Sequence, residues 1–207
     1  MNKLKLVFLI TCLSYVSSLY ADNIDNQYVK EYEDLQLKLK SQSNHEIMKE
    51  IGMIYDLNRN ASSFQTNLKL HPYITEIRNR GKNGDIEAKF ISNSLWNRNI
   101  CEGMMEQKMY SVGDTCSSVI NNLKEIANNK KDRRYTAQSM ESLGDIYNKG
   151  VVASKSDLLA AEWYYKAAVE YNNLGKRDES IRTLEQALNI LPSYKPALIF
   201  RKSIFGY

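Results

Sequence analysis

Histidine is the side chain most often used for proton transfer and metal binding. This 207-residue chain has two histidines, His45 and His71. Neither lies at a spacing from another ligand that is typical of a zinc site. The sequence also contains no Gly-rich phosphate loop and no nucleophile-elbow motif. We therefore expect a protein without a cofactor or metal centre, and we predict that it is not an enzyme.

Carboxylates are the next possible source of chemistry. A glycosidase needs two carboxylates that converge in one cleft. The glutamates in question are spaced along expected helix faces, and no pair among them is marked out: Glu46, Glu50, Glu162 and Glu170. Exposed helix charge is the simpler interpretation of this pattern.

Residues 1–21 have the pattern of a secretory signal peptide. Lys3 and Lys5 supply positive charge, residues 6–13 are apolar, and Ala21 is a small residue suited to cleavage. The apolar run is shorter than the roughly 20 residues that span a bilayer, so we expect no stable membrane insertion after cleavage. The segment predicts a periplasmic or secreted protein.

The three cysteines also give information about where the protein is located. Cys12 lies in a stretch that is faintly similar to a lipobox, but Thr11 is a poor residue directly before a lipidated cysteine, so we expect no lipid anchor. Cys101 and Cys116 remain after cleavage. In an oxidising compartment such a pair favours one disulfide, although two reduced, buried cysteines are the alternative.

The charge balance argues against a nucleic-acid partner. The net charge is +4, and Lys3 and Lys5 of the predicted signal peptide contribute two of the positive charges. The mature chain is therefore only mildly basic. The basic segment 128–134 could contact an acidic partner, but a solvated loop is the preferred interpretation.

Apolar residues at three- and four-residue steps predict an all-α protein of about ten helices joined by short loops. Ser43 and Glu46 form a capping-box pattern, and Asp85 can cap a later helix. Pro72 is suited to the first position of a helix, and Gly81 to the end of that helix. Residues 22–134 form the more irregular helical region.

Residues 135–207 carry the regular pattern, which is clearest over 139–192. One apolar face contains Leu143 and Tyr147, and Gly144 beside it allows another backbone to approach. Two further helices follow, with Ser156 or Asp157 as the cap of one and Asp178 as the cap of the other, and with stop signals at Gly150, Gly175 and Pro192. Helices of this length joined by short loops pack antiparallel.

Two repeat families share this pattern. Leu143-Gly144-x-x-Tyr147-x-x-Gly150, followed by Ala160-x-x-Trp163-Tyr164-x-Lys166-Ala167-Ala168, resembles the Sel-one-like repeat. Tyr171, Gly175, Leu184, Ala187 and Pro192 resemble a tetratricopeptide repeat, with Ser180 in place of its usual alanine. A weaker similarity lies upstream, where residues 51–55 repeat the pattern around Gly144 with Gly52 in its place.

The resemblance implies a fold and a function. The fold is an antiparallel helix-pair solenoid with irregular N-terminal helices. The function is that of a non-enzymatic scaffold or adaptor of the bacterial envelope, which binds a peptide or protein partner on its concave face during assembly, secretion or host interaction. The alternative is an envelope hydrolase acting on cell-wall or β-lactam-like substrates, an activity assigned to some secreted relatives that have more cysteines.

The same architecture implies where the partner binds, because the first helix of each pair lines the concave face. The residues we predict there are polar or aromatic: Asn148, Lys149, Tyr165, Glu170, Asn172 and Asn173. Ordinary exposed polar surface is the alternative interpretation of these six side chains.

Overall fold

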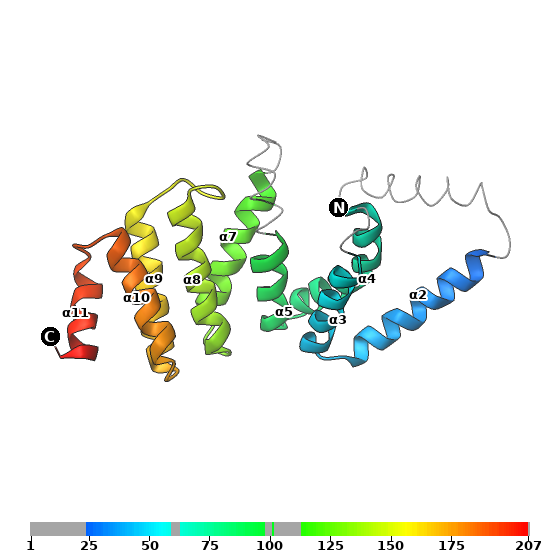
Figure 1. Cartoon of the computed structure of the whole chain (residues 1–207), viewed down its shortest axis with the longest axis horizontal. Helices are drawn as coiled ribbons and strands as arrows, with labels where there is room; N and C mark the ends of the chain where they lie inside the picture. The colour runs from blue at the N-terminus through cyan, green and yellow to red at the C-terminus, as the bar shows by residue number, and fades with distance from the viewer. Residues whose placement is uncertain (1–23, 59–62, 98–100, 102–112, 207) are drawn as a thin grey trace. The chain divides into compact units, whose positions relative to one another are not determined.

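The structure is a computed structural model that describes residues 24–58, 63–97, 101 and 113–206. Within these residues the chain forms nine α-helices and one π-helical segment (Figure 1). None of the described residues lies in a β-strand. The prediction of an all-α protein is confirmed. The chain divides into two compact units, residues 1–76 and 77–207, which are described separately below. The division predicted at 134/135 stays a prediction.

The first unit contains α2 (Ile24–Ser41), α3 (Asn44–Leu57) and the beginning of α4 (Ser63–Lys82). Ser43 caps α3 as predicted. The Glu46 amide donates to Ser43 Oγ at 3.2 Å, and the Ser43 amide donates to Glu46 Oε2 at 2.7 Å. Buried apolar side chains hold the unit together: Leu39, Ile47, Ile51 and Leu70.

The prediction that Pro72 begins a helix is wrong, because α4 runs without interruption from Ser63 to Lys82. A proline inside a helix removes the amide that would bond the carbonyl four residues earlier, here that of Leu68. The side chain of Pro72 is buried, whereas that of Leu68 is exposed.

Gly81 does not end α4 either. The chain leaves the helix at Gly84, whose φ of 98° is in the left-handed region that favours glycine. Gly81 instead allows a close approach to α5 (Ile86–Ile91), since a Cβ at position 81 would lie 2.8 Å from the Cα of Lys89. Asp85 caps α5 as predicted, accepting from the Ala88 amide at 2.9 Å.

The second unit continues with six further segments, each in contact with the next in chain order, and the five that follow η1 run antiparallel to one another (Figure 1). They are η1 (Ser92–Asn97), α7 (Gly113–Ala127), α8 (Arg133–Lys149), α9 (Asp157–Asn173), α10 (Arg177–Ile190) and α11 (Lys195–Phe205). Ser156 caps α9 as predicted. Asp178 is not a cap, because α10 begins one residue before it, and Asp178 lies in the first turn, where a carboxylate favours the helix dipole.

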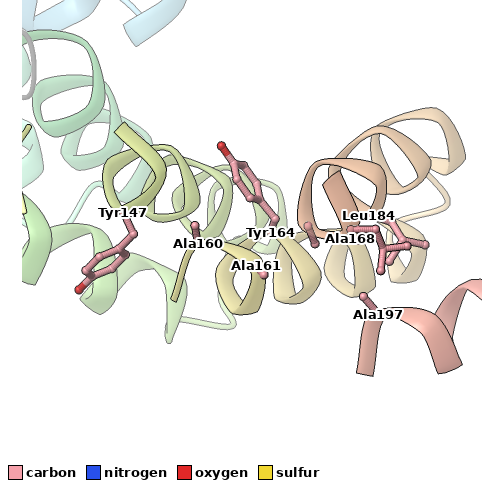
Figure 2. Packing of buried hydrophobic residues seen from close by; sticks show 9 residues of the cluster. Tyr147, Ala160, Ala161, Tyr164, Ala168, Leu184 and Ala197 are labelled. Atoms are coloured by element: carbon pink, nitrogen blue, oxygen red, sulfur yellow. The ribbon is translucent and has the colours of Figure 1, made fainter. Parts of the chain in front are cut away.

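Helix α9 is packed on both sides. Ala160, Ala161, Ala167 and Ala168 are completely buried, and their small side chains let α8 and α10 both approach α9 closely. Figure 2 shows three of these alanines in the cluster that also contains Leu184 of α10 and Ala197 of α11. Because α9 belongs to both helix pairs, it is the central element of this unit.

The contact between α8 and α9 depends on Gly144. The ring of Tyr164, which is 2% exposed and labelled in Figure 2, lies against the α8 backbone at this glycine. A Cβ at position 144 would lie 2.8 Å from the Tyr164 Cδ1 atom, which is closer than real Cβ contacts come. The predicted role of Gly144, a close approach between helices, is confirmed.

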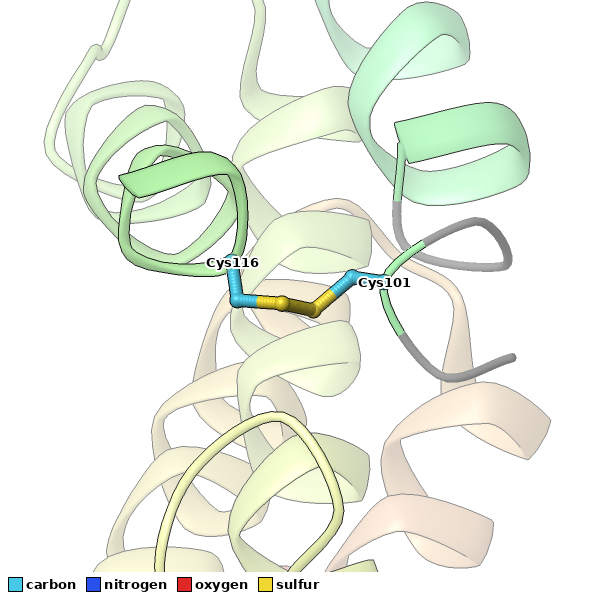
Figure 3. The surroundings of a disulfide bond; sticks show 2 residues. All are labelled: Cys101 and Cys116. Atoms are coloured by element: carbon cyan, nitrogen blue, oxygen red, sulfur yellow. A yellow bond between two sulfur atoms is a disulfide. The ribbon is translucent and has the colours of Figure 1, made fainter. Parts of the chain in front are cut away.

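Cys101 and Cys116 form the predicted disulfide (Figure 3). Their Cα atoms are 5.5 Å apart, within the range that a disulfide requires. Both cysteines belong to a buried cluster with Val119 of α7 and with Leu143 and Ile146 of α8. The bond therefore fixes α7 at its N-terminal end, next to the core shared with α8.

We predict that Gly144→Ala lowers the free energy of unfolding by about 1–3 kcal/mol, because neither the buried Tyr164 ring nor the α8 backbone has room to move. Gly52→Ala is the matched control. A Cβ at Gly52 in α3 would meet nothing within 4 Å, so this variant should be as stable as the wild type or more stable by about 0.5–1 kcal/mol. Urea unfolding followed by circular dichroism measures both. Equal effects at the two glycines would contradict the proposed contact.

We also predict that the double variant Cys101→Ala/Cys116→Ala is less stable by about 3 kcal/mol, the loop-closure value for a sequence separation of 15. Wild-type protein unfolded in excess reductant should give the same urea midpoint as the variant. A midpoint unchanged by either treatment would show that the bond does not stabilise the fold.

Candidate functional site

A hollow of about 340 Å³ lies between α8 and α10, with α9 beneath it. Its lining is mainly polar and charged, and comes from α5, α8, α9, the α9–α10 turn and α10: Phe90, Gln138, Glu141, Ser142, Asp145, Tyr171, Lys176, Glu179 and Arg182. The volume exceeds one side chain and lies at the lower end of the range typical of ligand sites.

Helical spacing explains why these side chains meet. Gln138, Glu141 and Asp145 recur at three- and four-residue steps, so they share one face of α8. Glu179 and Arg182 share a face of α10 for the same reason. Since α8 and α10 both pack on α9, their two polar faces form opposite walls of one groove.

A salt bridge joins the two walls of the groove. Arg182 donates from Nη1 to Glu141 Oε1 at 2.7 Å and from Nη2 to Glu141 Oε2 at 3.0 Å. The Tyr171 hydroxyl, from α9 below, donates to Glu141 Oε2 at 2.9 Å. Burial raises the pKa of Tyr171, and the negative charge of Glu141 raises it further. Glu141 therefore joins three helices through one carboxylate.

Two other carboxylates line the hollow. Asp145 accepts from the hydroxyl of Tyr164 at 2.5 Å. Glu179 accepts from Lys176 Nζ at 3.3 Å. A hydrogen bond from its own backbone amide, followed by the bond from Lys176, holds the pKa of Glu179 below its ordinary value. The pKa of Arg182 is raised, first by its bond to Glu141, and Asp145 contributes to this shift.

Gln138 stands out among the lining residues. Its side-chain carbonyl oxygen is shielded from solvent and has no hydrogen-bond partner among the described residues. A buried acceptor without a donor is rare and needs an explanation. Because this oxygen has no surface that a water molecule can reach, it does not face the open hollow.

The groove continues toward α5. The Tyr135 hydroxyl of α8 donates to Glu87 Oε1 of α5, and the Arg134 guanidinium lies 4.4 Å from the centre of the Tyr135 ring. The Phe90 ring, which lines the hollow, packs against Tyr135 with ring centres 5.5 Å apart. Burial raises the pKa of Tyr135, and its bond to Glu87 adds to the shift.

A second hollow, of about 550 Å³, lies beside the α7–α8 loop and the C-terminal end of α9. Glu170 and Asn173, two of the predicted binding residues, line it together with Lys130 and Arg133. Arg133 Nε lies 2.5 Å from Glu170 Oε1. The basic loop is thus placed next to α9, with one of its cations held by a carboxylate.

The other predicted residues lie elsewhere. Tyr165 is half-buried and packs edge to face against Tyr194 and Phe200, at 5.8 and 5.9 Å. Asn172 is exposed at the end of α9, whereas Asn148 and Lys149 lie at the end of α8. Because α8 and α9 are antiparallel, these two ends are a full helix length apart. The structure therefore does not gather the six residues in one place, and their role in binding stays a prediction.

The lining of the first hollow was not found from the sequence, although a pattern that indicates it is present. Gln138, Glu141 and Asp145 form a polar stripe on α8 beside the small residue Gly144. A polar stripe next to a close helix contact indicates a groove wall. The ring of Tyr171 is buried in the core, whereas its hydroxyl reaches the carboxylate of Glu141 in the groove.

Groups of metal ligands and membrane-spanning helices are both absent from the part of the chain that the structure describes. There, no group of three or more His, Cys, Asp and Glu side chains is placed to hold a metal ion. None of the described helices combines the length and the apolar character needed to cross a bilayer. The predicted signal peptide lies outside the described residues.

Comparison of the chain with protein-family models, with curated proteins and with solved structures found no significant match in any of the three.

The Tyr171–Glu141 bond gives a pH-dependent prediction. Because its pKa is raised, the folded hydroxyl keeps its proton at a pH where an unfolded tyrosine, with a pKa of 10.0, has lost it. Its contribution to stability is thus complete below pH 10 and is lost as the pH rises further. Tyr171→Phe should cost about 1 kcal/mol at neutral pH and should make the alkaline loss of stability shallower. Urea unfolding across this pH range tests both.

Tyr55→Phe is the control, since this ring is about half exposed, and it should leave the stability at neutral pH unchanged. Identical alkaline profiles for wild type and Tyr171→Phe would contradict the assigned hydrogen bond.

Proposed function

We propose that this protein is a non-enzymatic binding module of the helical-repeat type, in which the groove between α8 and α10 holds a segment of a partner polypeptide. The observation that carries the proposal is the hollow itself. It lies between alternate helices that share α9 as a common floor, which is how solenoid proteins form an extended binding surface. The similarity of residues 143–192 to Sel-one-like and tetratricopeptide repeats supports the same architecture.

The polar lining supports peptide binding over a closed small-molecule site. Peptide grooves of this kind offer several hydrogen-bonding groups along helix faces, and this one offers a carboxamide, a hydroxyl and several charges. The charged groups are held by salt bridges and tyrosine hydroxyls, so the groove is ordered before a partner arrives. Such preorganisation lowers the entropy cost of binding.

The alternative is a hydrolase, and one observation is relevant to it: the carboxylates of Glu141, Asp145 and Glu179 all line one hollow. Acid–base hydrolysis needs one carboxyl with a raised pKa as proton donor. The pKa of Glu179 is lowered, and both oxygens of Glu141 accept hydrogen bonds from Arg182. These contacts favour binding over proton transfer, and we place the hydrolase second.

Export from the cytoplasm is part of the proposal. The disulfide Cys101–Cys116 supports an oxidising compartment, since such bonds persist mainly outside the reducing cytosol. This agrees with the secretory pattern of residues 1–21 and with the proposed periplasmic or secreted location, without a lipid anchor. We place the proposed protein or peptide partner in the same compartment.

A peptide selection tests the function. Random peptides displayed on phage are selected on the wild-type protein, and the affinity of the best peptides is measured by fluorescence anisotropy. Ser142→Tyr, which adds a ring inside the hollow, should weaken these peptides by at least about tenfold, or about 1.4 kcal/mol. Ser154→Tyr, the same change at an exposed loop position, should leave their affinity unchanged.

Circular dichroism verifies that both variants are folded, and Gln138→Tyr serves as a second blocking variant. Failure to select any peptide, or selection of peptides that bind the blocked variants as tightly as the wild type, would disprove the proposed groove.

A further inference from the structure

Helix α2 carries an apolar stripe that is longer than the surface that covers it. Leu39, Leu35 and Tyr32 follow one another at steps of four and three residues, so they lie on one face of α2. Leu39 is completely buried and Leu35 is half-buried, whereas Tyr32 is 45% exposed. Val29, three residues further along, is 54% exposed. The core of the first unit therefore covers one end of the stripe and leaves the other end open to solvent.

The open end of α2 is acidic. Residues 29–34 are all exposed and contain Glu31, Glu33 and Asp34 together with Lys30. Three negative charges against one positive charge leave a formal charge of −2. Glu31 and Glu33 precede and follow Tyr32, so they flank its ring on the two sides of the helix. A helical turn that packs on nothing gains little stability, so a partner on this surface would stabilise it.

Helix α11 presents a surface of the opposite charge. Its Ala197 is completely buried in the cluster shared with α9 and α10. Lys195, Ile199 and Lys202 follow one another at steps of four and three residues on the other side of the helix. All three are exposed, and Ile199 is 71% exposed. Helix α11 contains no acidic residue, and neither lysine has a carboxylate partner among the described residues.

The two surfaces complement each other in shape and in charge. On α2 an apolar pair lies between carboxylates, and on α11 one apolar side chain lies between two cations. Two helices can pack the apolar groups together, while the flexible lysine stems carry their charges outward to the carboxylates. Two α11 surfaces would bring like charges together, as would two α2 surfaces. The charges therefore favour a contact between the two different surfaces.

We infer that α2 of one copy of this protein docks on α11 of a second copy. Val29 and Tyr32 then cover Ile199, and the carboxylates that flank Tyr32 pair with Lys195 and Lys202. The contact is heterologous, because each copy contributes a different surface to it. Neither surface contains a residue that lines one of the two hollows, so the inference does not rest on the proposed peptide groove.

Self-association tests the inference. The protein is produced from its complete coding sequence, purified as the cell processes it, and studied by sedimentation velocity from micromolar to millimolar concentration. We expect association that weakens between about 50 mM and about 0.5 M salt, because salt screens exposed charges. Glu31→Lys/Glu33→Lys and Lys195→Glu/Lys202→Glu should each weaken it at least about tenfold, since like charges then meet. A wild type that stays monomeric at millimolar concentration would overturn the inference.

An equimolar mixture of these two charge-reversed variants is the decisive measurement. In the mixture, the basic α2 of one variant meets the acidic α11 of the other. The unchanged acidic α2 of the second variant likewise meets the unchanged basic α11 of the first. Association should therefore return close to the wild-type affinity, although neither variant associates well alone. A mixture that associates no better than the separate variants would refute the contact between α2 and α11.

Two further variants separate this contact from general effects of charge. Lys130→Glu/Lys131→Glu reverses two exposed lysines elsewhere and changes the net charge by the same amount as the α11 variant. It should associate like the wild type, and an equal loss would reduce the effect to net charge and overturn the inference. Ile199→Ser keeps every charge and should weaken association several-fold, because it removes exposed apolar surface from the contact. Unchanged association of this variant would contradict the packing. Circular dichroism verifies that all variants are folded.

Discussion

The second unit depends on the contact between the α8 backbone at Gly144 and the ring of Tyr164. The ring is almost completely buried and lies within 2.8 Å of the place that a Cβ at position 144 would take, so glycine leaves the room that the ring needs between α8 and α9. This contact sets the position of α8 relative to α9, and the alanines of α9 set that of α10. The width of the groove between α8 and α10 follows from these two contacts.

Tyrosine hydroxyls bonded to carboxylates of a neighbouring helix recur through the unit. Tyr164 bonds Asp145, Tyr171 bonds Glu141, and Tyr135 bonds Glu87. In each pair the ring contributes to the core, and the hydroxyl reaches the edge where the polar wall begins. The same side chains therefore stabilise the fold and orient the carboxylates that line the groove. Removing such a hydroxyl leaves a carboxylate near the core with one donor fewer.

The sequence predicts the local features of the fold well, because short-range rules govern them. The capping box at Ser43, the caps at Asp85 and Ser156, the disulfide and the close approach at Gly144 all follow from residue types at fixed spacing. Pro72 and Gly81 were assigned to helix ends because each is common there, but their helix continues through them. The contact of Gly81 with α5 decides the second of these positions, and it is not encoded locally.

The groove could not be predicted to the same degree. Its central contact joins Glu141 and Arg182, which lie 41 positions apart, and no spacing rule links them. The fold had to place α8 and α10 on the same side of α9 before the pair could be recognised. Predicted residues such as Tyr165 were chosen from the general geometry of helix pairs, which does not include the aromatic contacts made by α11.

The burial of α9 on both sides has an evolutionary consequence. A helix whose alanines are completely enclosed tolerates few substitutions, since any larger side chain would push α8 or α10 away. The outward faces of α8 and α10 carry no such restriction. Descendants of this chain could therefore exchange the exposed residues of α8 and α10 and acquire new partners, while α9 keeps the scaffold unchanged.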